Sequence, residues 1–131
     1  NPVMVIAARA ALLSADEASS IVALAHVIAD IAKSIEIGPN ALEEDHLSQW
    51  LVPASSSRLR AIDIAINKTL VSQREYHPPY QLGNISKLSP LAALFYVALF
   101  RTARKVLSRF IPTNPTWVRT PGAGIDSICP L

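Results

Sequence analysis

The stretch SPLAALFYVALFRTARKVLSRF, residues 89–110, decides the fold class that this sequence predicts. Ser89 can cap a helix, and Pro90 suits the first helical turn, where its missing amide hydrogen leaves no partner unsatisfied. Neither glycine nor proline follows until Pro112. The sequence therefore predicts a helix that begins at Pro90 and ends before Pro112. Its uncharged apolar part, residues 91–100, is about half of a bilayer span, which favours a buried helix over a membrane-spanning one.

Proline, glycine and capping residues divide the preceding chain into four further predicted helices. Pro2 opens the first, and Ser14 with Glu17 forms a capping box that begins the second. Gly38 and Pro39 end the second helix. Asn40 with Glu43 repeats the capping pattern, Pro53 stops that third helix, and the serines at 55–57 cap a fourth. The expected ranges are about 2–13, 15–37, 41–52 and 58–75.

Apolar spacing supports the second and fourth of these helices. Ile21, Leu24 and Ile28 begin a stripe at helical spacing that continues to Ile35, and a similar stripe runs from Leu59 to Leu70. We find no alternating strand pattern, internal repeat or heptad run. The predicted fold is all-α, a compact bundle of about five helices.

The last twenty residues differ from the rest of the chain. Residues 112–131 contain four prolines and two glycines, which excludes a long helix and favours an extended arm. We therefore expect one helical domain over 1–111 and an extended C-terminal arm over 112–131.

Composition indicates a subunit of an assembly. Of 131 residues, 50% are hydrophobic and only 17% are charged, so a free monomer would expose apolar patches that usually mark interfaces. The single Cys129 cannot form an internal disulfide, which favours a reducing compartment. No basic segment precedes the apolar start, so we expect no secretory signal peptide and a location in a virion or inside a cell.

The two halves of the chain carry opposite charge. Residues 1–57 hold two basic and seven acidic side chains, a net charge of −5, whereas residues 58–131 hold ten basic and three acidic side chains, a net charge of +7. Such polarity suggests a polyanionic partner for the basic half, or copies of the chain that pack acid against base.

Cations gather near the end of the helix predicted over 90–111. Arg101, Arg104 and Lys105 stand at i, i+3 and i+4, and Arg109 lies one turn beyond Lys105, so one flank of the helix is basic. This flank could bind phosphate oxygens. A purely structural role is equally open, because the helix dipole favours cations near a helix C-terminus.

The helix predicted over 58–75 carries a second row of polar residues. Arg60, Asn67 and Arg74 recur every seven residues, which places them within about 40° of one another on one face. The flanking basic residues are Arg58 and Lys68. Arginine and asparagine suit a phosphate-lined surface, although Asp63 on the same side dilutes the charge. Two basic helices could form a groove for a nucleic-acid backbone, with contacts independent of base sequence.

No other chemistry has a comparable signal. His46, in the acidic run 43–46, could bind a metal together with His77, but the spacing matches no metal motif and such acids more often cap a helix. The glycines form no phosphate-binding loop, and no catalytic arrangement is implied. We expect no enzyme activity, no cofactor, no metal and no small-molecule substrate. The two tryptophans, Trp50 and Trp117, are interpreted as core or interface anchors.

A small helical chain rich in alanine and isoleucine, with excess apolar surface, a basic helical flank and a proline-rich arm, resembles the major coat proteins of filamentous viruses of hyperthermophilic archaea. In that group, paired helical subunits wrap double-stranded DNA and hold it in A-form. The resemblance lies in architecture and composition, and no motif carries it. It implies that the basic residues of both helices face DNA, namely Arg58, Arg60, Lys68, Arg74, Arg101, Arg104, Lys105 and Arg109. The acidic N-terminal half would then lie at contacts between subunits.

The sequence thus predicts a structural protein that self-assembles, with copies of itself or a homologous subunit, and coats nucleic acid without reading its sequence. The main alternative is a protein-only assembly subunit or adaptor, in which the charge split orients packing between copies. A protein that lies on a membrane surface comes third, because the helix over 90–111 combines apolar residues with cations.

Overall fold

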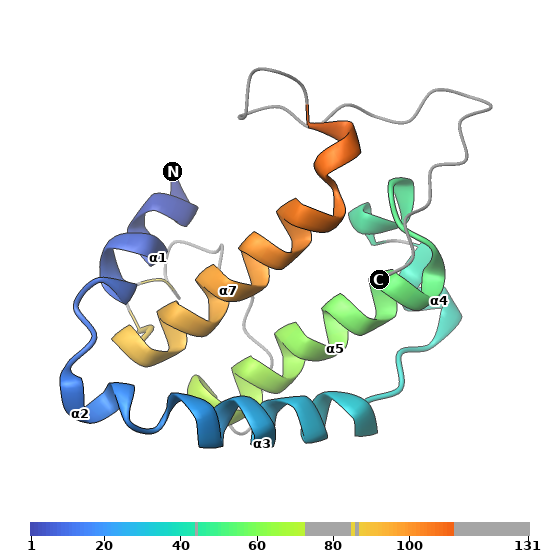
Figure 1. The fold of residues 1–131 in the computed structure, drawn as a ribbon. Coiled ribbons are helices and arrows are strands. Elements are labelled where there is room, and N and C mark those ends of the chain that lie inside the picture. The colour runs from blue at the N-terminus through green and yellow to red at the C-terminus, as the bar shows by residue number, and fades with distance from the viewer. Residues whose placement is uncertain (44, 73–84, 86, 112–131) are drawn as a thin grey trace.

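The computed structural model describes residues 1–43, 45–72, 85 and 87–111, and the helices and turns among them include no β-strand (Figure 1). The predicted all-α class is therefore confirmed. The predicted arm over 112–131 lies outside the described residues.

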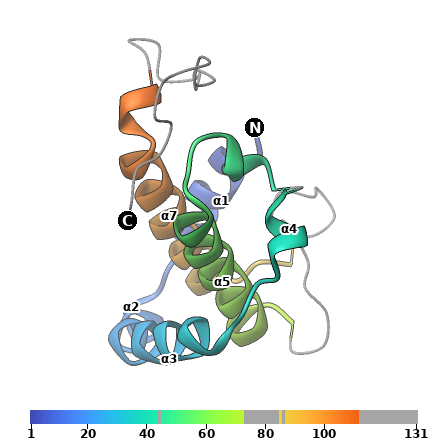
Figure 2. The ribbon, with the colours of Figure 1, turned by 90° about the vertical axis from the view of Figure 1, so that its right-hand side faces the viewer.

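Helix α7, Pro90–Val106, lies between two other helices. It packs against α1, Pro2–Ala10, near its N-terminal end and against α5, Pro53–Leu70, along another side (Figure 1). Helix α3, Ile21–Ser34, packs across α5 and forms the lower edge of the molecule in both views (Figures 1 and 2). None of the helices in the described part of the chain is long and apolar enough to span a bilayer.

The start of α7 follows the sequence prediction. The Ser89 hydroxyl accepts a hydrogen bond from the Ala92 amide at 3.1 Å, and Pro90 is the first helical residue. The α-helix ends at Val106, and a short 3₁₀ helix, η2 over Ser108–Phe110, continues the chain. The predicted helical stretch is thus confirmed, with a tighter last turn.

The capping box at Ser14 is confirmed, but the long helix expected after it is not. The Ser14 amide donates to Glu17 Oε2 at 3.0 Å, and the Glu17 amide donates to Ser14 Oγ at 3.2 Å. Helix α2 nevertheless ends after one turn, Ala15–Ala18, and α3 begins at Ile21. The Ser19 hydroxyl donates to the Asp16 carbonyl at 2.7 Å, a local bond that competes with helical continuation.

The segment between Gly38 and Pro53 was predicted wrongly in two respects. Pro39 opens a short helix α4, Pro39–Glu43, so Asn40 lies inside that helix and does not cap it. A 3₁₀ helix, η1 over His46–Gln49, follows, and Asp45 caps it by accepting from the Leu47 amide at 3.0 Å.

Pro53, which we predicted as the stop of the preceding helix, begins α5, and the prediction that the serines at 55–57 cap this helix is wrong. Proline marks a helix boundary from either side, because its fixed φ also suits a first turn. Ser55 and Ser56 are buried within the helix. Helix α5 ends at Leu70, and Val71 and Ser72 lie outside it, so the predicted helix end near Glu75 is wrong by about one turn.

The main core forms where α1, α3, α5 and α7 meet. Tyr96 is fully buried at its centre and stacks on Phe100 with ring centroids 6.2 Å apart. The buried residues of this cluster are Ile6, Ile28, Ala65, Ile66, Ile85, Leu88, Ala92, Ala93 and Tyr96. A second cluster of Leu51, Leu59, Leu107 and Phe110 joins the start of α5 to the end of α7.

Candidate nucleic-acid interface

The C-terminal part of α7 presents a row of cations to solvent. Arg101, Arg104, Lys105 and Arg109 are all exposed, while Leu107 and Phe110 of the same segment are buried. The apolar residues hold this end of the helix against α5 and η1 and so fix the direction of the basic flank. The predicted amphipathic division of the segment is therefore present in the structure. We call the four cations the basic row.

A shallow hollow of about 470 Å³ lies along the basic row. It is lined by Arg101, Arg104, Lys105, Ser108 and Ile111, so none of its lining residues is acidic. The arginine guanidinium groups, the lysine ammonium group and the serine hydroxyl can all donate to phosphate oxygens. Sequence reasoning did not foresee Ile111 in this site, because the residue lies beyond η2 and shares no helical face with the cations.

Asn67, which was predicted on the binding surface, is fully buried. Its Nδ2 donates to the Tyr96 hydroxyl at 3.4 Å and so joins α5 to α7 inside the core. Burial also raises the pKa of Tyr96, to which the nearby Asp63 carboxylate adds, while the hydrogen bond with Asn67 acts in the opposite direction. Because no solvent-borne ligand can reach it, Asn67 is removed from the candidate interface.

Arg60 is held by carboxylates of its own chain. Its Nε and Nη2 donate to the two carboxylate oxygens of Asp45 at 2.7 and 2.8 Å, and its Nη1 donates to Asp63 Oδ2 at 3.1 Å. The two carboxylate side chains are only 5% and 8% exposed. Arg60 therefore belongs to a structural ion-pair cluster, and we remove it from the candidate interface as well.

The pairing of Arg60 with Asp45 shifts the pKa of both residues. The hydrogen bond with Asp45 is the main reason that the pKa of Arg60 is raised, and burial opposes it. For Asp45, burial alone would raise the pKa, but hydrogen bonds from Arg60 and from the Leu47 amide outweigh burial, so the pKa of Asp45 is lowered. Both groups are thus held in their charged forms.

The remaining predicted residues of α5 do not join the basic row. Arg58 is exposed but lines a different, apolar groove between α3, α5 and α7. Lys68 is exposed ten residues further along α5, which corresponds to about 15 Å of helix. Arg74 lies outside the described residues. The two-helix basic groove expected from the sequence is therefore not formed among the described residues, and the basic row of α7 is the part of the prediction that stays together.

The acidic run at 43–46 has a structural use in this fold. Asp45 caps η1 and binds Arg60, while His46 is exposed at the start of η1. Across the described ranges, no three His, Cys, Asp or Glu side chains come close enough to hold a metal ion. His77, the second ligand considered in the sequence, lies outside these ranges.

Comparison of the chain with protein-family models, with curated protein sequences and with solved structures finds no match.

Proposed function

We propose that the protein is a structural subunit that assembles with copies of itself or a homologous subunit and coats nucleic acid without reading base sequence. The coat proteins of filamentous archaeal viruses, which the sequence resembles, do this with double-stranded DNA, and we propose the same polymer and a virion location here. The observation that carries the proposal is the basic row of α7 and its hollow, which no acidic residue lines.

The size of the basic row suits a polymeric ligand. From Arg101 to Arg109 the chain extends about 12 Å, while a DNA duplex carries about one phosphate charge per 1.7 Å of its axis, or roughly seven over that length. Four cations offset only part of this charge. Many copies side by side, each adding its own row, would neutralise the duplex progressively, which is the behaviour of a coat.

Exposed apolar side chains supply surfaces for assembly. Met4 on α1, Leu12 in the following turn and Val22 on α3 are 66%, 73% and 69% exposed. Other large hydrophobic residues on the surface are Val3, Val5 and Val27. Such residues lie on the acidic half of the sequence, away from the basic row in the chain, and contacts between copies would bury them. We also propose that residues 112–131 form an extended arm that reaches a neighbouring copy.

The proposal is tested by the salt dependence of binding. Affinity for unrelated DNA duplexes is measured by fluorescence anisotropy over a series of salt concentrations. Because each neutralised phosphate releases counterions, log K should fall steeply and linearly with log salt, and the slope should be the same for every duplex sequence. A flat dependence on salt, or a strong preference for one duplex, would contradict the coating function.

The second candidate is a protein-only assembly subunit, and the exposed apolar residues by themselves favour it. Met4→Glu combined with Val22→Glu would place charge on the proposed contact surface in either case. If this variant loses self-association in light scattering while wild-type protein shows no salt-sensitive binding to duplexes, the protein-only assembly is the correct function.

A further inference from the structure

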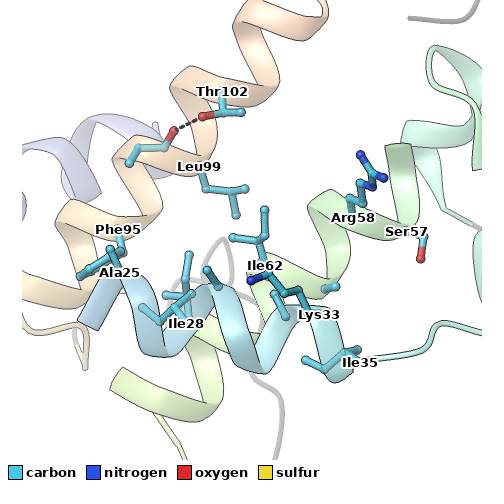
Figure 3. Close-up of a pocket in the computed structure, with 15 residues that line it drawn as sticks. Ala25, Ile28, Lys33, Ile35, Ser57, Arg58, Ile62, Phe95, Leu99 and Thr102 are labelled. Atoms are coloured by element: carbon cyan, nitrogen blue, oxygen red, sulfur yellow. Dashed lines mark hydrogen bonds between the residues drawn. The ribbon is translucent and has the colours of Figure 1, made fainter. Parts of the chain in front are cut away.

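An apolar groove of about 720 Å³ runs between α3, α5 and α7 (Figure 3). Its volume falls within the range of small-molecule sites, about 300 to 1,000 Å³. Ile66 and Ala61 are buried and belong to its lining, and Ile28, Phe95 and Leu99 contribute larger side chains. The groove is distinct from the basic row, and the proposed function makes no use of it.

The groove stays open because small residues line it from every helix. Ala25, Ala29 and Ala32 lie on α3, Ala61 lies on α5, and Ala98 lies on α7. Helices α3 and α7 both pack against α5, and alanine side chains are too short to fill the space that remains between α3 and α7. The stripe of α3 that the sequence assigned to the core is consequently only partly covered, and Ile28 is its one fully buried member among the described residues.

Polar groups gather at one end of the groove. Lys33, near the C-terminal end of α3, and Ser57 and Arg58, in the second turn of α5, line one part of the groove, whereas Ala25, Ile28 and Phe95 lie toward the other end (Figure 3). Arg58 is exposed and forms no hydrogen bond or ion pair with the rest of the described chain. The groove therefore has a cationic end and an apolar end.

Lys33 at the cationic end is paired with an acid of its own helix. Asp30 accepts from Lys33 Nζ at 3.0 Å, but both side chains are more than three-quarters exposed, at 77% and 76%. An ion pair that is so exposed to water contributes little to stability. Lys33 can therefore turn toward another anion at a small cost in free energy. The net charge of the three groups, Lys33, Arg58 and Asp30, remains positive.

We propose that this groove binds an amphiphile with a single acyl chain and an anionic head, of which a long-chain carboxylate is the simplest member. The acyl chain would lie against Ile28, Ile66 and Phe95. The head would lie between Lys33 and Arg58, with the Ser57 hydroxyl as a further donor. A helix from a second copy is the competing occupant, but the separation of charge from apolar surface along the groove matches a head and a tail.

The ligand class is tested first with saturated carboxylates of ten to sixteen carbons, used below their micelle concentrations. Binding is followed by displacement of a fluorescent fatty acid from the full chain. We expect saturable binding at one site, tightening by about fourfold per methylene until the groove is filled. The alcohol and the trimethylammonium compound of the same chain length should bind roughly tenfold more weakly or worse. Equal binding of the anionic and cationic compounds, or binding that never saturates, would overturn the proposal.

Variants then locate the site. Ala98→Trp and Ala29→Trp place a large ring in the groove from opposite walls, and both alanines are exposed, so each variant should keep wild-type helicity in circular dichroism. Either variant should abolish binding of the carboxylates and of the fluorescent fatty acid that they displace. Lys33→Gln combined with Arg58→Gln should weaken the binding of carboxylates about tenfold. The gain in affinity for each added methylene should stay unchanged. Lys68→Gln with Lys87→Gln, two exposed lysines outside the groove lining, is the control of equal charge and should bind as wild type.

The competing occupant gives a different pattern. If carboxylates do not bind, and Ala98→Trp instead converts an oligomer to a monomer in light scattering, a second copy fills the groove and the amphiphile site is excluded. If both tryptophan variants bind carboxylates as well as wild type does, the ligand lies elsewhere and the proposal is likewise wrong. Neither result depends on nucleic-acid binding, which the basic row would retain.

Discussion

Arg60 binds both carboxylate oxygens of Asp45, through Nε at 2.7 Å and Nη2 at 2.8 Å. The two residues are fifteen positions apart, and they come from the halves of the sequence with opposite net charge. Part of the charge asymmetry is thus used inside the fold, where it fastens the turn before η1 to α5. The remaining asymmetry is on the surface, where the basic row lies.

The first prediction concerns the stability that Arg60 provides. Arg60→Met should lower the free energy of unfolding by about 3 kcal/mol, because the variant leaves two nearly buried carboxylates without their cation. Urea unfolding followed by circular dichroism measures the change. Arg58→Met, which alters an exposed residue on the same helix, should stay within about 0.5 kcal/mol of wild type. Equal effects of the two substitutions would show that the cluster adds no stability.

The second prediction is an acid-sensitive loss of stability. The pKa of Asp45 is lowered in the folded protein from its ordinary value of 3.8. A lowered folded pKa means that the stabilisation is complete above pH 3.8 and is lost as the pH falls below it. The free energy of unfolding, measured between pH 6 and pH 2, should therefore decline more steeply in wild type than in Asp45→Asn. If the free energy of unfolding of the two proteins declined in parallel, Asp45 would not be the source of the acid sensitivity.

The third prediction concerns Tyr96. Tyr96→Phe removes the hydroxyl that accepts from Asn67 and should cost about 1 to 2 kcal/mol, because a buried amide loses one partner. The pKa of Tyr96 is raised above 10.0, chiefly by burial, so this contribution is present below pH 10 and declines as the pH rises further. The difference between wild type and variant should shrink in unfolding experiments from pH 8 to pH 11. A difference that is constant over this range would contradict the assignment.

The fourth prediction addresses the cap of α7. Ser89→Ala should destabilise the protein by about 1 kcal/mol, since the Ala92 amide loses its acceptor. Thermal unfolding provides the measurement. Ser108→Ala, at an exposed serine near the other end of the same segment, is the matched control and should be close to neutral.

The fifth prediction separates the binding and structural roles of the basic row. Arg101→Gln with Lys105→Gln should reduce the slope of log K against log salt by about 1.8 for duplex DNA, because two phosphate contacts are removed. The control variant, Lys33→Gln with Lys87→Gln, changes the net charge equally outside the row and should leave most of the slope in place. Helicity should be unchanged in both variants. A loss of helicity in the first would show that these cations serve the helix dipole instead.

Local signals in the sequence predicted local structure well. The capping box at Ser14 and the cap at Ser89 depend on residues three positions apart, so their geometry follows directly from the sequence. Pro53 shows the limit of such signals. A proline indicates a boundary but does not say on which side the helix lies, and here it lies on the C-terminal side.

The errors at Arg60 and Asn67 have a different origin. Periodicity places the two residues on one face of a helix, but it does not tell whether that face meets solvent or a neighbouring helix. The answer depends on Asp45 and Tyr96, which are 15 and 29 residues away, and sequence spacing does not reveal those contacts. The α7 cations are exposed, in agreement with the apolar flank on the same helix that indicated the opposite side as the buried one.

One long-range contact has a consequence for the order of folding. Arg9 in α1 donates to the Leu88 carbonyl, 79 residues away, at 2.9 Å, and α1 packs on α7. The apolar helix α1 thus leaves the ribosome long before its partner does, and its apolar side chains stay uncovered during that interval. Docking of α1 also closes the longest loop among the described helices, so we expect it to occur late in folding. Chaperone dependence during synthesis should therefore concentrate on the first dozen or so residues of this chain.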